Sequence, residues 1–140
     1  AQMQAAESIT QRRLDIWMDY HHAFEPLEQR GRIRRPGIPV DCKHNAHMYY
    51  LILGSLEDRS SFIEFMGNRD ISCVFHYIPL HTSSQGLSSG WAVGDMAFTQ
   101  GLADRLVRLP LWVGLEDVQN DVIKKAAEYF EVASKGSAVL

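Results

Sequence analysis

The chain has 140 residues, of which 46% are hydrophobic and 22% are charged, and its formal net charge is −3. This length and composition fit one globular domain with its own core, and the lack of a clustered basic face disfavours a nucleic-acid surface. The only dense basic run, residues 30–35, is interrupted by a glycine and followed by prolines. We interpret it as a solvated connector, with binding of an anionic ligand as the alternative.

The sequence shows no segment that would place the protein in a membrane or in an oxidising compartment. Its longest strongly apolar run, residues 48–53, is far shorter than the ~20 residues that cross a bilayer. Residues 1–13 contain no apolar signal-peptide core. Two cysteines, Cys42 and Cys73, are too few for a disulfide framework, and no pairing is predicted. We therefore expect a cytoplasmic protein.

The amino-terminal part predicts a long helix followed by a connector. Apolar residues recur at steps of three, four and seven between residues 5 and 25, which is the pattern of an amphipathic helix. Pro26 disfavours a helical conformation of the residue before it, so the helix should end or kink there. After the connector, residues 45–53 form a nearly continuous apolar run, as in a central strand, which Gly54 closes.

A helix of about three turns is expected over residues 56–67, with Asp58 or Ser60 as its amino-terminal cap. The strand that follows, residues 71–78, is rich in branched and aromatic side chains that suit a largely buried, pleated surface. Pro79 has no amide donor, so pairing should stop before it.

Two histidines flank this strand end. His76 should be held by the strand, whereas His81 should lie beyond the proline, at the start of a mobile loop rich in serine and glycine over residues 82–90. Their spacing alone favours an ordinary structural interpretation over a functional one, with His76 as a satisfied core histidine and His81 as a loop residue.

The carboxy-terminal part predicts a helix over residues 95–107 with a cap at Asp95, a short extended piece at 109–112 and a helix over 116–132. The last seven residues, 134–140, should fray. Helices outnumber strands, so we expect an α+β fold. It would be a two-layer small domain with a short, mostly antiparallel sheet and helices packed mainly on one face. Residues 1–31 would form the connecting helix and residues 32–133 the α/β core.

Two kinds of site that use histidine, a zinc site and a nucleophilic active site, are disfavoured by the sequence. Residues of the types that ligate zinc lie near the ends of the two expected strands: Cys42, His44 and His47 at one, and Cys73, His76 and His81 at the other. Their spacing is poor for zinc, because structural sites use tight pairs and side chains three apart on a strand point to opposite faces. A nucleophilic enzyme is also disfavoured, because the sequence has no Gly-x-Ser-x-Gly motif.

Three segments carry a resemblance to a known family: NAHMYYL at 45–51, VFHYIPLH at 74–81 and RLVRLPLW at 105–112. Their order and approximate spacing resemble the carboxy-terminal part of the DegT-type sugar-nucleotide aminotransferases. The resemblance runs from residue 1 to about residue 130, and NAHMYYL points to a subgroup that acts on dTDP-4-keto-6-deoxy sugars.

The resemblance implies a pyridoxal-phosphate enzyme that transfers an amino group, from glutamate, to C4 of the keto-sugar. In such enzymes the Schiff-base lysine and the acidic partner of the pyridinium nitrogen belong to a large domain upstream. The present chain would then be the carboxy-terminal small domain, inactive alone. It would work with its own amino-terminal large domain, in a homodimer, with pyridoxal phosphate bound by the large domain.

By the same resemblance, His81 would contact the sugar nucleotide, and His76, His47 and Asn45 are weaker candidates for substrate binding. An imidazole can donate a hydrogen bond to a sugar hydroxyl or a phosphate oxygen. No catalytic, cofactor-binding or metal-binding residue is expected in this chain. The alternative is a non-catalytic binding or interaction module whose histidine loop grips another anionic ligand.

Overall fold

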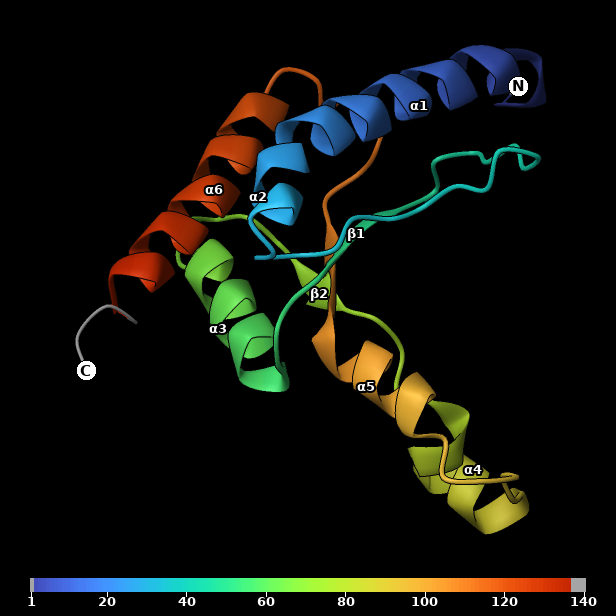
Figure 1. Cartoon of the computed structure of the whole chain (residues 1–140). Coiled ribbons are helices and arrows are strands. Elements are labelled where there is room, and N and C mark those ends of the chain that lie inside the picture. The colour runs from blue at the N-terminus through green and yellow to red at the C-terminus, as the bar shows by residue number, and fades with distance from the viewer. Residues whose placement is uncertain (1, 137–140) are drawn as a thin grey trace.

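The computed structural model describes residues 2–136, with side chains from residue 3 to residue 132. In chain order the elements are η1 (Gln2–Ala5), α1 (Ala6–Ala23), α2 (Glu25–Gln29), β1 (Tyr49–Ile52), α3 (Leu56–Gly67), β2 (Val74–Phe75), η2 (Leu80–Thr82), α4 (Ser84–Ser89), α5 (Ala97–Arg105), β3 (Leu106–Leu109) and α6 (Gln119–Gly136). The sheet lies at the centre, α1, α2, α3 and α6 gather on one side, and α5 and α4 extend away as an arm (Figure 1). Among the described residues, no helix is long and apolar enough to span a bilayer.

The sheet has three antiparallel strands in the order β1-β3-β2. The strand in the middle, β3, is the last of the three in the sequence. Arg108 of β3 lies opposite Tyr50 of β1 on one side and Val74 of β2 on the other. The expected fold class, a small α+β domain with an antiparallel sheet, is therefore confirmed.

One face of the sheet packs on the helices. Because side chains alternate along a strand, Tyr49 and Leu51 of β1 share this face with Val107 and Leu109 of β3, and all four are buried. The apolar face of α1 meets them, and the Tyr20 hydroxyl donates a hydrogen bond to the carbonyl of Pro110 (3.0 Å). Burial of these side chains is the main stabilising contribution to the domain.

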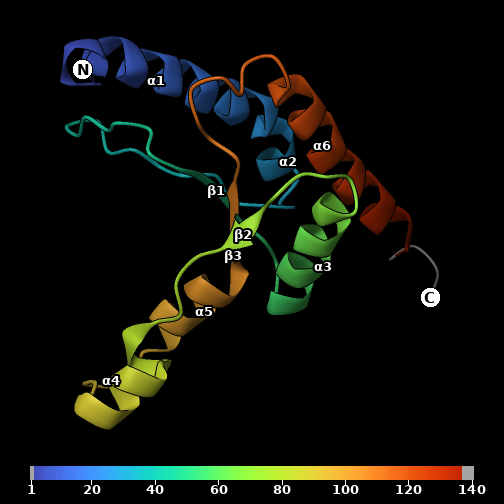
Figure 2. The ribbon, with the colours of Figure 1, turned by 180° about the vertical axis from the view of Figure 1, so that it is seen from behind.

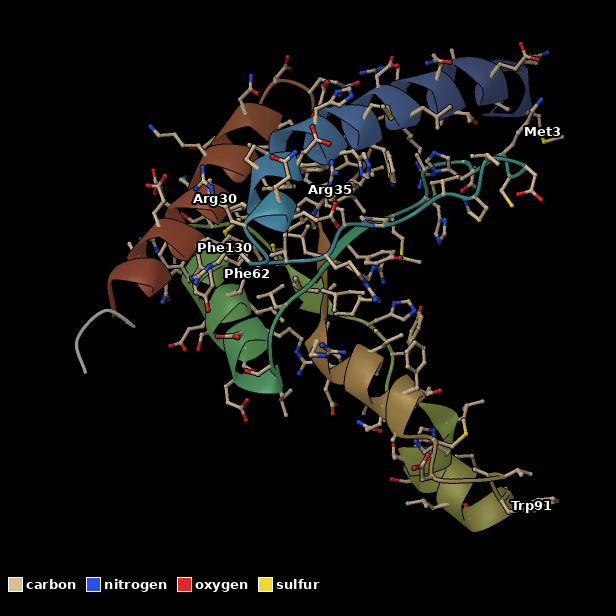
Figure 3. The ribbon with its side chains drawn as sticks, in the orientation of Figure 1. Met3, Arg30, Arg35, Phe62, Trp91 and Phe130 are labelled. Carbon is tan, nitrogen blue, oxygen red and sulfur yellow. The ribbon has the colours of Figure 1, made fainter. Side chains whose placement is uncertain are left out.

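A second part of the core lies between α3 and α6. Phe62 of α3 is fully buried. Its ring stacks on Phe130 at 5.7 Å and meets Tyr129 edge-on at 5.2 Å. Figure 3 shows Phe62 and Phe130 side by side where the two helices approach. These ring pairs join α6 to α3.

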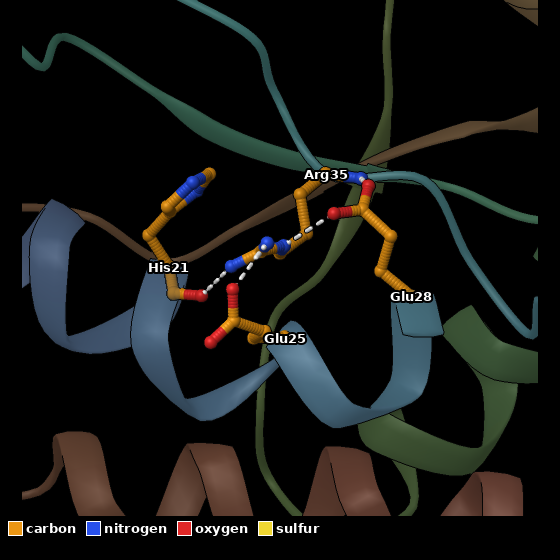
Figure 4. A network of polar contacts seen from close by, with 4 residues as sticks. All are labelled: His21, Glu25, Glu28 and Arg35. Atoms are coloured by element: carbon orange, nitrogen blue, oxygen red, sulfur yellow. Dashed lines mark hydrogen bonds and ion pairs between the residues drawn. The ribbon is translucent and has the colours of Figure 1, made fainter. Parts of the chain in front are cut away.

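The connector after α2 is anchored by one arginine (Figure 4). The Arg35 side chain is only 10% exposed and pairs with Glu28 (Nε to Oε2, 2.7 Å) and Glu25 (Nη2 to Oε1, 3.3 Å). It also donates a hydrogen bond to the His21 carbonyl. Burial alone would raise the pKa of Glu28, but hydrogen bonds from the Arg35 amide and guanidinium lower it. The expected solvated connector is therefore wrong at Arg35, which fixes the chain to α1 and α2.

Both flanking strands are shorter than predicted. β1 begins at Tyr49 rather than at residue 45, because Ala46 has a left-handed backbone (φ 48°) that interrupts the extended chain. The Asn45 side chain accepts a hydrogen bond from the His47 amide (3.2 Å), which forms a turn at this point. β1 also lies at the side of the sheet and not at its centre.

The strand predicted over residues 71–78 is reduced to Val74–Phe75. It was expected to be largely buried, but Val74 and Phe75 are 45% and 50% exposed. This prediction is wrong because β2 is a two-residue edge strand that pairs only with β3 (Figure 2). Val74 lies opposite Arg108 on the second face, and Phe75 lies opposite Val107 at the edge of the helix-covered face. Ile71 and Cys73 are buried, as expected, but lie before the strand.

The helix bounds 56–67 are confirmed, but the cap is Ser55, whose hydroxyl accepts a hydrogen bond from the Asp58 amide (3.1 Å). The stretch 82–90 is not an open loop, because most of it forms α4, which begins at the Ser83 cap. Its hydrogen-bonded turns correct the prediction of a mobile loop in this region.

The helix expected over 95–107 ends at Arg105, and the chain continues directly as β3, so the extended piece expected at 109–112 lies mostly after the strand. Asp95 accepts a hydrogen bond from the Ala97 amide, although Met96 is the residue that flanks the helix start. Of the tail expected to fray, residues 134–136 belong to α6, and residues 137–140 lie outside the described residues.

Candidate functional site

The sheet has a second face, opposite the one that packs on α1, which we call the open face. It carries Tyr50, Ile52, Val74, Leu106 and Arg108, and of these only Ile52 is a buried residue. His76 comes two residues after Val74, just beyond the end of β2, on the side of the chain that carries the open face. The positions of the predicted site residues are described below relative to this open face.

His76 lies directly after β2 and is half-buried. Its ring meets Tyr77 edge-on at 4.9 Å, and its Nδ1 atom is buried without a hydrogen-bond partner among the described residues. Burial, followed by the charges of Arg108 and His47, lowers the pKa of His76. The lowered pKa favours the neutral imidazole near pH 7, and its buried Nδ1 atom lacks a hydrogen-bond partner among the described residues.

Asn45 and His47 form a local pair before β1. The Asn45 amide oxygen lies 3.2 Å from the His47 backbone nitrogen and 3.2 Å from its Nδ1 atom. Both residues are exposed. Since the charge of His47 acts on His76, the structure brings three predicted residues, Asn45, His47 and His76, to the same part of the molecule.

His81 occupies a different position, on η2 at the base of the arm. It lines a cavity of about 800 Å³. The other lining residues include several from α4 and, from the segment that follows α4, Trp91 and Val93. Figure 3 shows Trp91 at the far end of the arm. A second cavity of about 450 Å³ is lined by His76 and by apolar residues of α5. Both cavities include Pro79, Leu80 and Thr99, so His81 and His76 line adjoining hollows.

The arm that carries His81 is fixed to the domain by Arg59 of α3. The Arg59 guanidinium lies 5.2 Å from the ring centroid of Phe75 and donates a hydrogen bond to the Ala103 carbonyl of α5 (3.2 Å). Arg59 therefore connects α3, β2 and α5, and so sets the position of both cavities.

Within the arm, α4 packs very closely on η2. A Cβ atom added to Gly86 would lie 1.6 Å from the Leu80 carbonyl oxygen. The Gly86 amide donates a hydrogen bond to the Ser83 hydroxyl (3.0 Å), which caps the helix. This glycine allows the approach of α4 that shapes the wall next to His81.

Arg108 is the site residue that sequence reasoning missed. It lies on the open face in the central strand and acts electrostatically on His76. Burial alternates along Leu106–Leu109 and leaves Arg108 on the less buried side, but the run L-V-R-L has only one polar residue, so its sequence shows no apolar–polar alternation that would have marked Arg108.

The described lysines do not fit a resident pyridoxal phosphate. Lys43 is exposed in the connector, Lys124 is exposed on α6, and Lys125 pairs with Asp121 at 2.7 Å. None of these three is a desolvated amine of the kind that forms a Schiff base. Within residues 2–136, no group of three or more His, Cys, Asp or Glu side chains is placed to hold a metal ion.

The sequence model of the DegT/DnrJ/EryC1/StrS aminotransferase family matches residues 1–127. The chain belongs to this family. The expected family resemblance is confirmed, and the match covers β1, β2 and β3.

Several solved structures contain a part with the same fold as this chain. The aminotransferase TlmJ from Streptoalloteichus hindustanus superposes with a TM-score of 0.81 at 20% identity, over 94% of this chain and 34% of that one. PseC from Helicobacter pylori, an aminotransferase of pseudoaminic acid biosynthesis, gives 0.80 at 15% identity, over 94% and 35%. A putative sugar aminotransferase from Streptococcus pneumoniae, in its PLP form, gives 0.74 at 22% identity, over 93% and 33%. The chain thus spans about a third of the length of these structures.

Proposed function

We propose that this chain is the carboxy-terminal small domain of a pyridoxal-phosphate-dependent sugar-nucleotide aminotransferase. The observation that carries the proposal is the family match over residues 1–127, together with a length of about a third of its structural relatives. The enzyme would work as a homodimer in which an amino-terminal large domain holds the cofactor. The positions of the described lysines, on the surface or ion-paired, support a cofactor site outside this chain.

The proposed reaction is transfer of an amino group from glutamate to C4 of a dTDP-4-keto-6-deoxy sugar. The segments NAHMYYL and VFHYIPLH support this choice, because they resemble dTDP-4-amino-4,6-dideoxygalactose transaminase of enterobacterial common antigen or other surface polysaccharide synthesis. In this assignment His81, with its cavity of about 800 Å³, forms one wall of the substrate site. His76, His47 and Asn45 would lie beside it.

Replacement of His81 by alanine in the intact enzyme tests this assignment. We expect kcat/KM for the keto-sugar to fall by the equivalent of about 1 to 3 kcal/mol, the range for one hydrogen bond to a polar or charged group. Stability should change little, because His81 is only half-buried and makes no side-chain hydrogen bond with a described residue. The measurement is steady-state kinetics with glutamate and dTDP-4-keto-6-deoxyglucose.

The matched control is His22→Ala, which removes an exposed histidine of α1 and should leave kcat/KM unchanged. His76→Ala should instead lower the melting temperature more than turnover at saturating substrate, because part of its ring is buried. An unchanged kcat/KM for His81→Ala together with a sharply lower melting temperature would make His81 a packing residue. Inactivity of the intact wild-type enzyme on any dTDP-keto-sugar would refute the proposed substrate class.

The 140-residue chain by itself is expected to be inactive and to form no aldimine with added pyridoxal phosphate. The reason is that Lys43 is solvated and Lys125 is ion-paired with Asp121, so neither is activated as a nucleophile. Absorbance spectra with and without borohydride test this prediction. A saturable visible band that borohydride abolishes, and that Lys43→Arg removes, would contradict it.

A further inference from the structure

Arg108 is a charged group on the sheet whose interactions are incomplete. It lies in the central strand between Tyr50 and Val74 and is only partly exposed. Its Nε atom is buried and has no hydrogen-bond partner, and its guanidinium forms no ion pair with any residue that the structure describes. A desolvated donor of this kind is costly unless something else satisfies it.

Comparable arginines of this chain find acceptors. Arg35 binds Glu28, Arg12 pairs with Glu116 at 2.7 Å, and Arg105 donates to the Gly101 carbonyl at 2.7 Å. Arg59, whose Nε atom is also buried without a partner, still uses another nitrogen to bind the Ala103 carbonyl. Arg108 therefore differs from these arginines in having no acceptor in the described part of the chain.

No carboxylate among the described residues pairs with Arg108. His76 has a buried Nδ1 atom with no partner among the described residues, and burial, followed by the charges of Arg108 and His47, lowers the pKa of its imidazole. Arg108 lies opposite Val74, which precedes His76 by two residues, so the guanidinium and this imidazole come from adjacent positions of the sheet. Both groups can donate a hydrogen bond, and so can the imidazole of His47, whose charge also acts on His76.

We propose that Arg108, with His76 and His47, binds an oxyanion of the ligand, either a carboxylate or a phosphate group. This role of Arg108 rests on the proposed function, because that function places the two histidines at a ligand site. It assigns to Arg108 the role of holding the charged end of the ligand.

The chemistry of the guanidinium favours this class of ligand. Its planar edge presents two parallel N–H donors that match two oxygens of a carboxylate or phosphate. The Nε atom of Arg108, which has no hydrogen-bond partner among the described residues, is one of the two donors of such an edge. The neighbouring cavity of about 450 Å³, which His76 and Leu106 line with mainly apolar residues, gives room for the uncharged part of the ligand.

Two sources could supply the oxyanion in this reaction class: a carboxylate of a dicarboxylic amino donor, or the diphosphate of a nucleotide sugar. A carboxylate and a phosphate both present oxygens that a guanidinium can bind, so the chemistry of Arg108 alone does not choose between these sources. Two probes distinguish the sources: glutarate for the dicarboxylate and inorganic pyrophosphate for the diphosphate.

The test is a titration of the 140-residue chain with each probe, followed through the histidine ring resonances by NMR. We expect one of the probes to shift the His76 and His47 resonances saturably, with the tighter probe identifying the source. In Arg108→Gln the affinity for that probe should fall about tenfold or more, as for a lost charge-assisted hydrogen bond. Arg108→Lys should recover only part of it, because lysine lacks the planar fork.

The matched control is Arg34→Gln, which removes an exposed arginine of the connector and should leave both titrations unchanged. Circular dichroism checks that each variant is folded. The proposal is overturned if neither probe shifts the His76 resonance, or if the shift is the same in Arg108→Gln. Because this titration involves no transamination, its failure is separate from a failure of the intact enzyme to use a dTDP-keto-sugar.

Discussion

Replacing Phe62 by alanine is expected to lower the free energy of unfolding by about 3 to 5 kcal/mol, the usual cost of truncating a fully buried aromatic side chain. Phe62 is 0% exposed and touches Tyr129 and Phe130 of α6. The substitution removes both ring contacts and leaves a cavity between α3 and α6. Urea unfolding of the 140-residue chain, followed by circular dichroism, measures the change.

Phe98 of α5 provides the control, because it is the same residue type and 78% exposed. Phe98→Ala should change the free energy of unfolding by less than about 0.5 kcal/mol. A loss below about 1 kcal/mol for Phe62→Ala would show that α6 does not pack on α3 through this ring in solution.

Replacing Gly86 by alanine is expected to displace α4 from η2. The added Cβ would lie 1.6 Å from the Leu80 carbonyl oxygen, and this neighbour is backbone, which has little freedom to move. Overpacking of this kind costs about 1 to 3 kcal/mol or more. Because α4 is a short peripheral helix, the loss should appear locally, as faster hydrogen exchange of the Leu87 and Gly90 amides, which are bonded within α4.

The control for this effect is Gly101→Ala in α5, where nothing lies within 4 Å of the new Cβ. It should leave exchange in α4 unchanged and stabilise α5 by about 0.5 to 1 kcal/mol, since alanine is the better helix former. Unchanged protection of Leu87 and Gly90 in Gly86→Ala would mean that α4 does not rest on η2. In the intact enzyme, Gly86→Ala should also reduce keto-sugar use, because α4 forms the wall beside His81.

The helices were largely predictable because their signals are local. The period of Phe62 and Met66 and the stop at Gly67 gave the bounds of α3 directly from the sequence. α4 was missed because serine and glycine are typical of loops. Its stability depends on the Ser83 cap and on the close approach of Gly86 to Leu80, a contact that composition does not reveal.

The sheet was less predictable because its pairing is not local. β3 was assigned partly to a helix, since Leu106 continues the apolar period of α5 and the strand is recognised only through pairs such as Leu109 with Tyr49. Val74 and Phe75 were expected to be buried because their residue types suit a sheet. Residue type does not specify whether a strand lies at the edge of its sheet, where side chains on either face are less covered, and β2 is such a strand.

The candidate site depends on this strand order. His47 and His76 follow from motifs near two strands, but the arginine that lies between those strands was not identified from sequence, because its position required β3 to be central. The roles of His81, His76, His47 and Asn45 in substrate binding remain predictions. The experiments on the intact enzyme decide them.

The strand order also governs when the sheet can form during synthesis. β1 and β2 do not pair with each other, and each forms its ladder only with β3. A nascent chain therefore exposes both segments until residues 106–109 have left the ribosome, and Tyr49 then pairs with Leu109 across a long loop. Such distant pairing is slow and leaves strand edges open to other chains. The carboxy-terminal third of the chain thus completes the sheet, and a chain released before residue 106 carries two apolar segments that lack their ladder partner.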